Sequence, residues 1–306
     1  MAQNIEAGDI SKGIDTLTQA LETAKKAAYK AGQYLKEKRG KVEILNKKAL
    51  RDDLLDVDLK AENIIISILK EEYPEFGILS EEVASINKDC PDRWVVDPLD
   101  GSFNFQHGNP TFAISISLIL ENTTILGVVY LPLQDEMFSA IRGRGAFLNE
   151  KPIHVSLTSY LNESIVHVGD FAKDGNFYDN KVRLHDIARL ANNVGRVRMI
   201  GTAATDLAFV ACGRAEALVV HNALPWDIEV GRLLVSEAGG KIASLQEDKS
   251  GRSLMICSNE KVHSQLQDII SKRFSRQNKR VSSRKSIYMS KFLRFLKWNS
   301  AAHLLA

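Results

Sequence analysis

Two apolar runs stand back to back near the middle of the chain and constrain its fold more than any other feature. Residues 112–120 (FAISISLIL) and 124–132 (TILGVVYLP) are rich in β-branched residues, and three polar residues, Glu121-Asn122-Thr123, separate them. Such runs around a short polar break predict a β-hairpin. A short apolar strand (WVVD, 94–97) precedes the hairpin, and one or two antiparallel strands are expected within 137–149. This part of the chain is therefore predicted to form a sheet.

Two helices are predicted before this sheet. In residues 14–39 leucine and alanine recur every three or four positions, and Gly40 follows as a stop. A second helix is expected to start after Asp58, with an apolar face, and to end before Tyr73. This spacing is typical of helices that pack one face on a core.

Beyond His154 short apolar strands alternate with helices. Strands are expected near 164–168, 196–200, 216–220, 241–245 and 254–258, and helices near 181–191, 202–213 and 227–240. The alternation favours two fused α/β halves, roughly 1–155 and 156–271, over a barrel. We find no internal repeat.

The cysteines and the first residues bear on the cellular compartment. The chain of 306 residues has three cysteines, Cys90, Cys212 and Cys257, which are far apart and lack metal-ligand spacing. This favours neither a disulfide framework nor a zinc site. The first residues, MAQNIEAGDISKG, are polar and lack the apolar core of a signal peptide. A reducing, cytoplasmic location is expected.

The charge is distributed unevenly. The net charge is +2, but ten Lys or Arg residues and no acidic residue follow Asp268, which leaves 30 basic and 38 acidic residues before them. The body is therefore not expected to bind polyanions broadly. We predict a basic C-terminal extension at 272–306, in which 287–305 would form an amphipathic helix on an anionic membrane surface. A solubilising extension and binding to RNA are the alternatives.

Carboxylates gather at four places: DDLLDVD (52–58), SEE (80–82), DPLD (97–100) and PWD (225–227). Asp97 and Asp100 would flank one turn, into which the Leu99 carbonyl can point. Hard oxygen ligands without His or Cys indicate Mg²⁺ or Mn²⁺. The alternative is that Asp-Pro-Leu-Asp-Gly forms a tight turn in which Asp caps a helix, and the sequence pattern leaves it open.

Gly101 and Ser102 follow this motif directly. Their backbone N–H groups, and the positive end of any helix that begins there, would attract an anion. A divalent metal beside an anion cradle is what phosphoryl transfer needs. The stretch is therefore predicted to be a metal and phosphate site.

These residues carry a resemblance. WVVDPLDGSFNFQHGNP (94–110) and PWDIEVGRLLVSEAGG (225–240) resemble the two signatures of the inositol monophosphatase family, and the match extends from about Asp52 to Ser258. The resemblance implies an α/β fold of the layered α/β/α/β/α sugar-phosphatase type. It also implies a Mg²⁺-dependent, lithium-sensitive phosphomonoesterase that acts on a small phosphorylated polyol or sugar and forms a homodimer.

The resemblance assigns roles by position. Glu81, Asp97, Asp100, Asp227 and the Leu99 carbonyl would hold two metal ions. Asp58 and Ser102 would be catalytic, because they would hold the attacking water. The remaining assignments are contacts to the phosphate or the substrate, made by Gly101, Ser102, Gly201, Thr202, Ala203 and Asp227. Asn104 and His107 are expected to fix the loop.

Several positions depart from the family pattern. Ser102 stands where the family usually has Thr, and Leu55 stands where it has Thr three residues before the catalytic Asp, so Asp56 would have to replace the missing hydroxyl. Val220 takes the place of a Glu that contacts the substrate, which predicts weak discrimination among phosphomonoesters unless His221 or Asn222 replaces it. Glu229 takes the place of a small residue.

The expected activity is hydrolysis of inositol 1-phosphate or a related sugar or polyol phosphate by metal-activated water. The alternatives are a 3'(2'),5'-bisphosphate nucleotidase, a fructose-1,6-bisphosphatase, or a non-catalytic protein that binds RNA or a transcription complex.

Overall fold

The computed structural model describes residues 7–50, 52–83, 85–246 and 253–271. The chain divides into two compact units, Met1–His263 and Ser264–Ala306. The predicted extension at 272–306 lies outside the described residues, so its boundary and its helix stay predictions. All elements named below belong to the first unit, except that the helix at 260–271 runs across the boundary.

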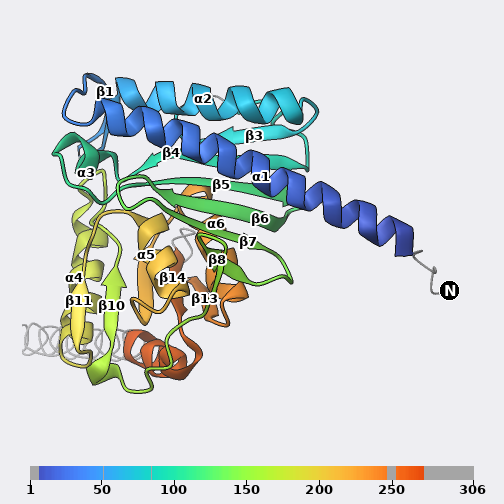
Figure 1. Cartoon of the computed structure of the whole chain (residues 1–306). Coiled ribbons are helices and arrows are strands. Elements are labelled where there is room, and N and C mark those ends of the chain that lie inside the picture. The colour runs from blue at the N-terminus through green and yellow to red at the C-terminus, as the bar shows by residue number, and fades with distance from the viewer. Residues whose placement is uncertain (1–6, 51, 84, 247–252, 272–306) are drawn as a thin grey trace, which may run out of the picture. The chain divides into compact units, whose positions relative to one another are not determined.

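A seven-stranded sheet forms around the predicted hairpin (Figure 1). The hairpin strands are β5 (Ala113–Leu120) and β6 (Thr123–Leu131), and the residues between them, Glu121 and Asn122, have positive φ. The other strands follow in the order of the sheet: β3 (Gly77–Ser80), β4 (Arg93–Asp100), β7 (Glu136–Ile141), β8 (Ala146–Leu148) and β9 (Lys151–Ile153). Only β3 and β4 pair in parallel within this sheet, and its other pairs are antiparallel.

Two long helices cover one face of this sheet. Helix α1 (Ala7–Lys38) contacts β5, β6 and β7, and α2 (Asp56–Glu72) contacts β4. The small residues Ala24, Ala28 and Ala31 of α1 are fully buried, which lets the helix pack closely. Both predicted helices are therefore confirmed.

A five-stranded sheet forms from the second half of the sequence. Its order is β11 (Arg196–Arg198), β10 (Ile165–Val168), β12 (Ala217–His221), β14 (Ser253–Ser258) and β13 (Lys241–Gln246). Strands β10, β11 and β12 are parallel, whereas β14 is antiparallel to β12 and β13. A 3₁₀ turn, η1 (Leu161–Glu163), precedes β10.

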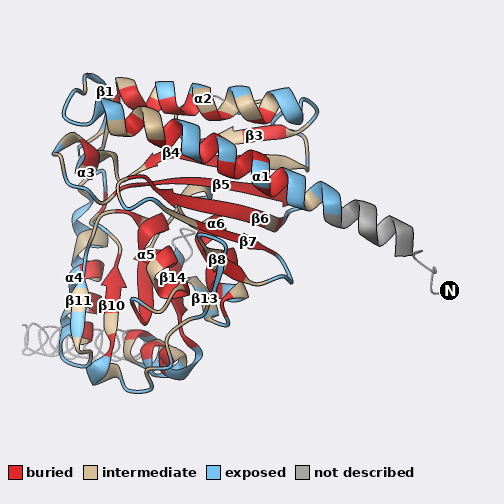
Figure 2. Cartoon of the chain, in the orientation of Figure 1, coloured by how far each residue is buried: buried red, intermediate tan, exposed pale blue. Residues whose placement is uncertain are grey.

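Helices α5 (Ala203–Ala211) and α6 (Pro225–Glu237) lie between the two sheets. Helix α6 contacts β4 to β8 of one sheet and β13 and β14 of the other, and α5 packs on α6 and β12. Helix α4 (Phe177–Ala191) contacts β11. Figure 2 shows the buried residues concentrated on the sheets and on α5 and α6. The fold is therefore a layered α/β/α/β/α sandwich, as expected.

The structure corrects four element predictions. Helix α2 begins at Asp56, so Asp58 lies inside its first turn. A hairpin of β1 (Ile44–Ala49) and β2 (Asp52–Leu55) precedes α2 and was not predicted. Helix α4 begins at Phe177, because Asn176 caps it through its side chain. Strand β4 continues through the predicted turn to Asp100, with a shift in its register to β5 between Asp97 and Asp100.

All three cysteines are free thiols. None of the helices in the described residues has both the length and the apolar character needed to cross a membrane.

Candidate functional site

Three predicted metal ligands converge where β3, β4 and α6 meet. Glu81 directly follows β3, Asp97 lies on β4, and Asp227 lies in the first turn of α6. One carboxylate oxygen of each lies within 4.8 Å of the others, a spacing that one metal ion can bridge. Because β3 and β4 are parallel neighbours, their carboxyl ends bring Glu81 and Asp97 to the same edge.

The register shift in β4 shapes the motif around Asp97. The Asp97 carboxylate accepts a hydrogen bond from the Leu99 N–H at 3.0 Å, which turns the side chain toward its own strand end. Asp97 is 1% exposed. Asp-Pro-Leu-Asp is therefore part of a buried, irregular strand end rather than a solvent-exposed helix cap.

Crowding and burial strongly perturb these carboxylates. Burial, together with the charges of Glu81, Asp100 and Asp227, raises the pKa of Asp97 well above its usual range. Burial and the Asp227 charge raise the pKa of Asp100 to about 8. A divalent cation is the usual means of neutralising such a group. The donor set, oxygen ligands without His or Cys, fits Mg²⁺.

Asp58 and Asp227 are oriented in the same way at the starts of two helices. Leu55 N–H donates to Asp58 Oδ2 at 2.9 Å, and Leu224 N–H donates to Asp227 Oδ2 at 3.0 Å. Asp58 Oδ1 is buried and has no hydrogen-bond partner among the described residues. Burial raises the pKa of Asp58 to about 8.

Asp56 does not replace the hydroxyl that Leu55 lacks. Its carboxylate accepts from the Glu43 N–H at 2.8 Å and so ties α2 to the segment before β1. Leu55 itself is fully buried and apolar. The expectation that Asp56 would support Asp58 is therefore wrong.

Two lysines reach the acidic cluster from other segments. Lys48 Nζ, from β1, lies 2.7 Å from Glu82 Oε1 and 3.3 Å from Glu81 Oε1. Lys173 Nζ lies 3.8 Å from Glu81 Oε1. Both glutamates follow the end of β3 at Ser80, and both contact Lys48. Glu81 is the one that belongs to the three-carboxylate group.

Glu62, which the sequence analysis missed, organises the segment that carries Glu81. This fully buried residue lies one turn after Asp58 on α2. Its Oε1 accepts hydrogen bonds from the Ser80 hydroxyl, from the Glu82 N–H at 3.1 Å and from the Val83 N–H at 3.3 Å. These three hydrogen bonds, called the Glu62 clamp below, hold the chain on both sides of Glu81. The sequence does contain a signal for Glu62: it is an acidic residue on the apolar face of a predicted helix, four residues after Asp58.

Asp100 is bound to the other half of the molecule. Its Oδ2 accepts from the Thr202 hydroxyl and from the Ala204 N–H, each at 2.6 Å. Thr202 is the N-cap of α5, so the start of this helix holds a predicted metal ligand. Asp100 does not belong to the group formed by Glu81, Asp97 and Asp227.

The predicted phosphate cradle lies next to this contact. Gly101 has φ of +95°, and α3 (Ser102–Gln106) begins directly after it. A Cβ at Gly101 would lie 3.3 Å from Thr202 Cβ and 3.4 Å from the Gly201 carbonyl oxygen. Gly101 therefore lies against Gly201 and Thr202, and the other predicted phosphate or substrate contacts, Ser102 and Ala203, directly follow these residues in the sequence.

Asn104 connects the same segments. Its amide donates to the carbonyls of Thr111 at 2.9 Å and Ile200 at 2.7 Å. His107 bonds to the Phe103 carbonyl at 2.9 Å. Both residues hold the loop together, as expected.

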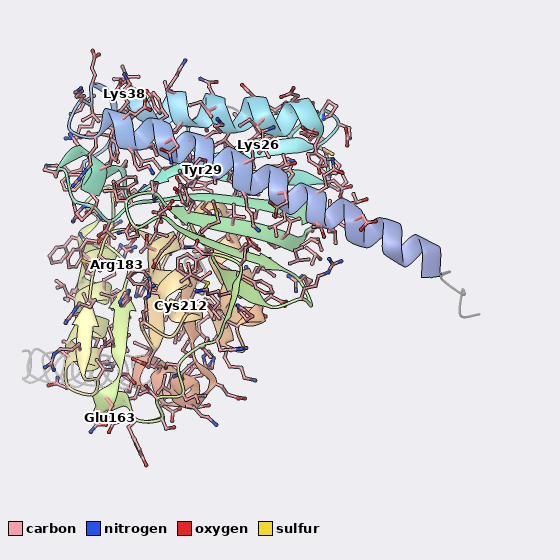
Figure 3. The ribbon with its side chains drawn as sticks, in the orientation of Figure 1. Lys26, Tyr29, Lys38, Glu163, Arg183 and Cys212 are labelled. Atoms are coloured by element: carbon pink, nitrogen blue, oxygen red, sulfur yellow. The ribbon has the colours of Figure 1, made fainter. Side chains whose placement is uncertain are left out.

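At position 220, where the family has a Glu that contacts the substrate, this chain has Val, and the residues at 220–222 make contacts within the protein. Val220 is 7% exposed and packs on Gly169. His221 Nε2 lies 3.2 Å from Asp186 Oδ2, and the guanidinium of Arg183, labelled in Figure 3, donates to the His221 carbonyl at 3.2 Å. The Asn222 side chain accepts from the Ser253 N–H at 3.1 Å. These contacts give no support to His221 or Asn222 as the replacement contact.

Glu229 lies on α6 and bonds to Thr124 and Arg232. Its carboxylate accepts from the Thr124 hydroxyl at 2.5 Å and from Arg232 Nη1 at 3.2 Å. The substitution of a small residue by Glu is therefore accommodated by two polar partners on β6 and α6.

Comparison with known proteins shows the family to which the chain belongs. The model of the inositol monophosphatase family matches residues 16–278. The chain belongs to this family. It is a phosphoric monoester hydrolase.

Relatives in this family have two kinds of names. The chain is 38% identical to a putative Nus factor SuhB of Neisseria meningitidis, over 82% of this chain and 97% of the relative. It is 35% identical to an inositol-1-monophosphatase of Mesorhizobium japonicum, over 81% and 95%. The crystal structure of the extragenic suppressor protein suhB of Bartonella henselae superposes with a TM-score of 0.77 at 34% identity, over 82% of this chain and 98% of that one.

Proposed function

We propose that this phosphatase is Mg²⁺-dependent and hydrolyses a small phosphate monoester of a polyol or sugar, with inositol 1-phosphate as the first candidate. The observation that carries the proposal is the convergence of Glu81, Asp97 and Asp227, with Asp97 on the strand that leads directly into Gly101 and Ser102. A cluster of hard oxygen ligands next to an anion cradle suits the hydrolysis of a phosphate ester.

In this proposal each residue has a defined task. Glu81, Asp97 and Asp227 hold the metal, and Asp100 and the Leu99 carbonyl complete the ligand set. Bound Mg²⁺ supplies positive charge that lowers the pKa of water and stabilises the charge on the leaving oxygen. Backbone N–H groups of Gly101 and Ser102 bind the phosphate. The Ser102 hydroxyl and Asp58 orient the attacking water, and Asp58 accepts its proton at the unpartnered Oδ1.

A phosphate-release panel tests the proposal. The full chain is assayed with Mg²⁺ and with EDTA on inositol 1-phosphate, fructose 1,6-bisphosphate, adenosine 3',5'-bisphosphate and p-nitrophenyl phosphate. Release from the inositol ester that needs Mg²⁺ supports the proposal. Preference for either bisphosphate would assign the chain to the corresponding alternative activity.

A second candidate function is binding to a transcription complex or RNA. It is favoured by the name of the Neisseria relative and by the ten basic residues that follow Asp268. Comparing the full chain with a chain that ends at Ser271, for binding to RNA and to phosphatidylglycerol vesicles at low and high salt, separates this function from attachment to an anionic membrane. Equal binding by the two chains would show that the basic extension contributes neither to RNA binding nor to membrane binding.

A further inference from the structure

Three parallel strands of the five-stranded sheet end at the edge that faces the candidate site. Strand β11 leads to Gly201 and the start of α5, and β12 leads to Asp227 at the start of α6. Strand β10 lies between them and stays paired with β12 until the Gly169 N–H, which donates to the Val219 carbonyl at 3.0 Å. The next residue, Asp170, therefore emerges at the same edge as the other two strand ends.

The Asp170 carboxylate lies against the backbone that forms the cradle. Asp170 Oδ2 would be 3.5 Å from a Cβ at Gly201, and the Gly201 carbonyl would in turn be 3.4 Å from a Cβ at Gly101. Gly201 has φ of +81°, and it lies next to both the Asp170 carboxylate and Gly101. The Asp170 side chain is exposed. Three residues later, Lys173 reaches Glu81 at 3.8 Å, so the segment runs from the cradle to the acidic cluster.

We propose that Asp170 determines substrate specificity by accepting hydrogen bonds from hydroxyl groups of the polyol or sugar whose phosphate lies on Gly101 and Ser102. This inference rests on the proposed function and deepens it. A carboxylate accepts through two oxygens and so can bind two neighbouring hydroxyl groups. At the neighbouring strand end Val220 is apolar, His221 contacts Asp186, and the Asn222 side chain accepts from the Ser253 N–H.

The proposal also defines what the site disfavours. A second phosphate group on the leaving alcohol would lie close to a carboxylate of like charge. A neutral, hydroxyl-rich leaving group is therefore preferred over a bisphosphate. This replaces the weak discrimination that the loss of a carboxylate at position 220 predicted.

The test compares two substrates in the full-length, Mg²⁺-loaded protein. Myo-inositol 1-phosphate carries hydroxyl groups beside the ester, and p-nitrophenyl phosphate carries none. Asp170→Ala is expected to lower kcat/KM for the inositol ester about 10- to 100-fold, mainly through KM, and to change kcat/KM for p-nitrophenyl phosphate less than about two-fold. Asp170→Asn keeps an acceptor oxygen but loses the charge, so its loss on the inositol ester is expected to be smaller.

The matched control is Asp174→Ala, which removes an exposed carboxylate from the same segment. It is expected to leave both substrates unchanged. An unchanged ratio of the two kcat/KM values in both Asp170 variants would overturn the specificity role, whether activity is kept or lost on both substrates. A wild-type protein that hydrolyses p-nitrophenyl phosphate but not the inositol ester would overturn the substrate class. A protein that hydrolyses neither substrate would contradict the proposed function itself.

Discussion

The two sheets contribute to the candidate site in different ways. The seven-stranded sheet contributes Glu81, Asp97 and Asp100 from the ends of the adjacent strands β3 and β4. The five-stranded sheet contributes one short segment from the end of each of three strands. Apart from Asp227, the predicted metal ligands are therefore local in sequence, within residues 81–100, whereas the opposite side of the site is assembled from distant segments.

This difference predicts where a substitution acts. Changes near β3 and β4 should affect metal binding, because they act on the ligands or their supports. Changes at the strand ends of the five-stranded sheet, other than at the predicted ligand Asp227, should affect how the ligands and the substrate are oriented. Four experiments test this division, beginning with the largest expected effect.

The largest effect is expected for Asp97→Asn. Removing this buried carboxylate takes away a metal ligand, so kcat/KM should fall by at least about 10³-fold, while the fold is retained because one like charge has left the crowded cluster. Steady-state kinetics and thermal melting measure the two quantities. Asp89→Asn in an exposed loop is the control. Near-normal turnover at saturating Mg²⁺ would rule out Asp97 as a ligand.

Glu62→Ala is expected to weaken Mg²⁺ binding about 10- to 100-fold, because it releases the chain on both sides of Glu81. Calorimetric titration of the metal-free protein with Mg²⁺ measures this directly. Glu62→Gln keeps an acceptor and should recover part of the affinity, and Glu72→Ala on the exposed face of α2 serves as the control.

One outcome would contradict a role of Glu62 in metal binding. A folded Glu62→Ala protein with unchanged Mg²⁺ affinity would show that the clamp only stabilises the fold. If that variant does not fold, Ser80→Ala decides the question, since it removes one of the three donors to Glu62. Unchanged affinity in a folded Ser80→Ala protein would likewise count against the clamp.

A smaller effect is expected for Thr202→Val, which tests the link between the two sheets. The variant loses the hydroxyl that holds Asp100 at 2.6 Å and also loses the N-cap of α5. We expect kcat/KM to fall about ten-fold and the free energy of unfolding to fall by about 1 kcal/mol. Thr202→Ser should restore both values. Loss of stability without loss of activity would show that Asp100 does not depend on α5.

The last prediction concerns the pH dependence of stability without metal. The folded-state pKa of Asp58 and of Asp100 is about 8, against 3.8 for a free carboxyl. Between these values the folded protein binds more protons than the unfolded chain, so its stability is greatest at low pH and falls as the pH rises toward 8. Each group contributes at most about 1.4 kcal/mol per pH unit.

Urea unfolding in EDTA and in Mg²⁺, from pH 5 to 9, measures this slope. Mg²⁺ should stabilise the protein more at pH 8 than at pH 5, because the ionised carboxylates bind the cation. The slope in EDTA should be shallower in the Asp97→Asn variant, since a carboxyl group whose own pKa is raised in the folded protein is gone. If Mg²⁺ stabilises the protein equally at pH 5 and pH 8, the prediction that the site carboxylates titrate in this range is wrong.

The sequence by itself determined the sheet hairpin, the helices before it and the carboxylates of the acidic cluster. These features are local, because apolar periodicity and turn residues act over a few positions and Asp97, Asp100 and Gly101 are almost adjacent. Apolar periodicity does not determine where a helix starts, since a side-chain cap such as Asn176, or the hairpin before α2, sets its first residue.

Only the tertiary structure decided which distant residues support the site. The bond between Thr202 and Asp100 spans 102 positions, and the bond between Glu62 and Ser80 spans 18. Periodicity carries no information about such pairs. The same holds for Asp170, which gains its proposed role because three parallel strands end at one edge and bring it beside Gly201. A sequence pattern specifies which side chains are available, but the packing of the layers determines which of them meet.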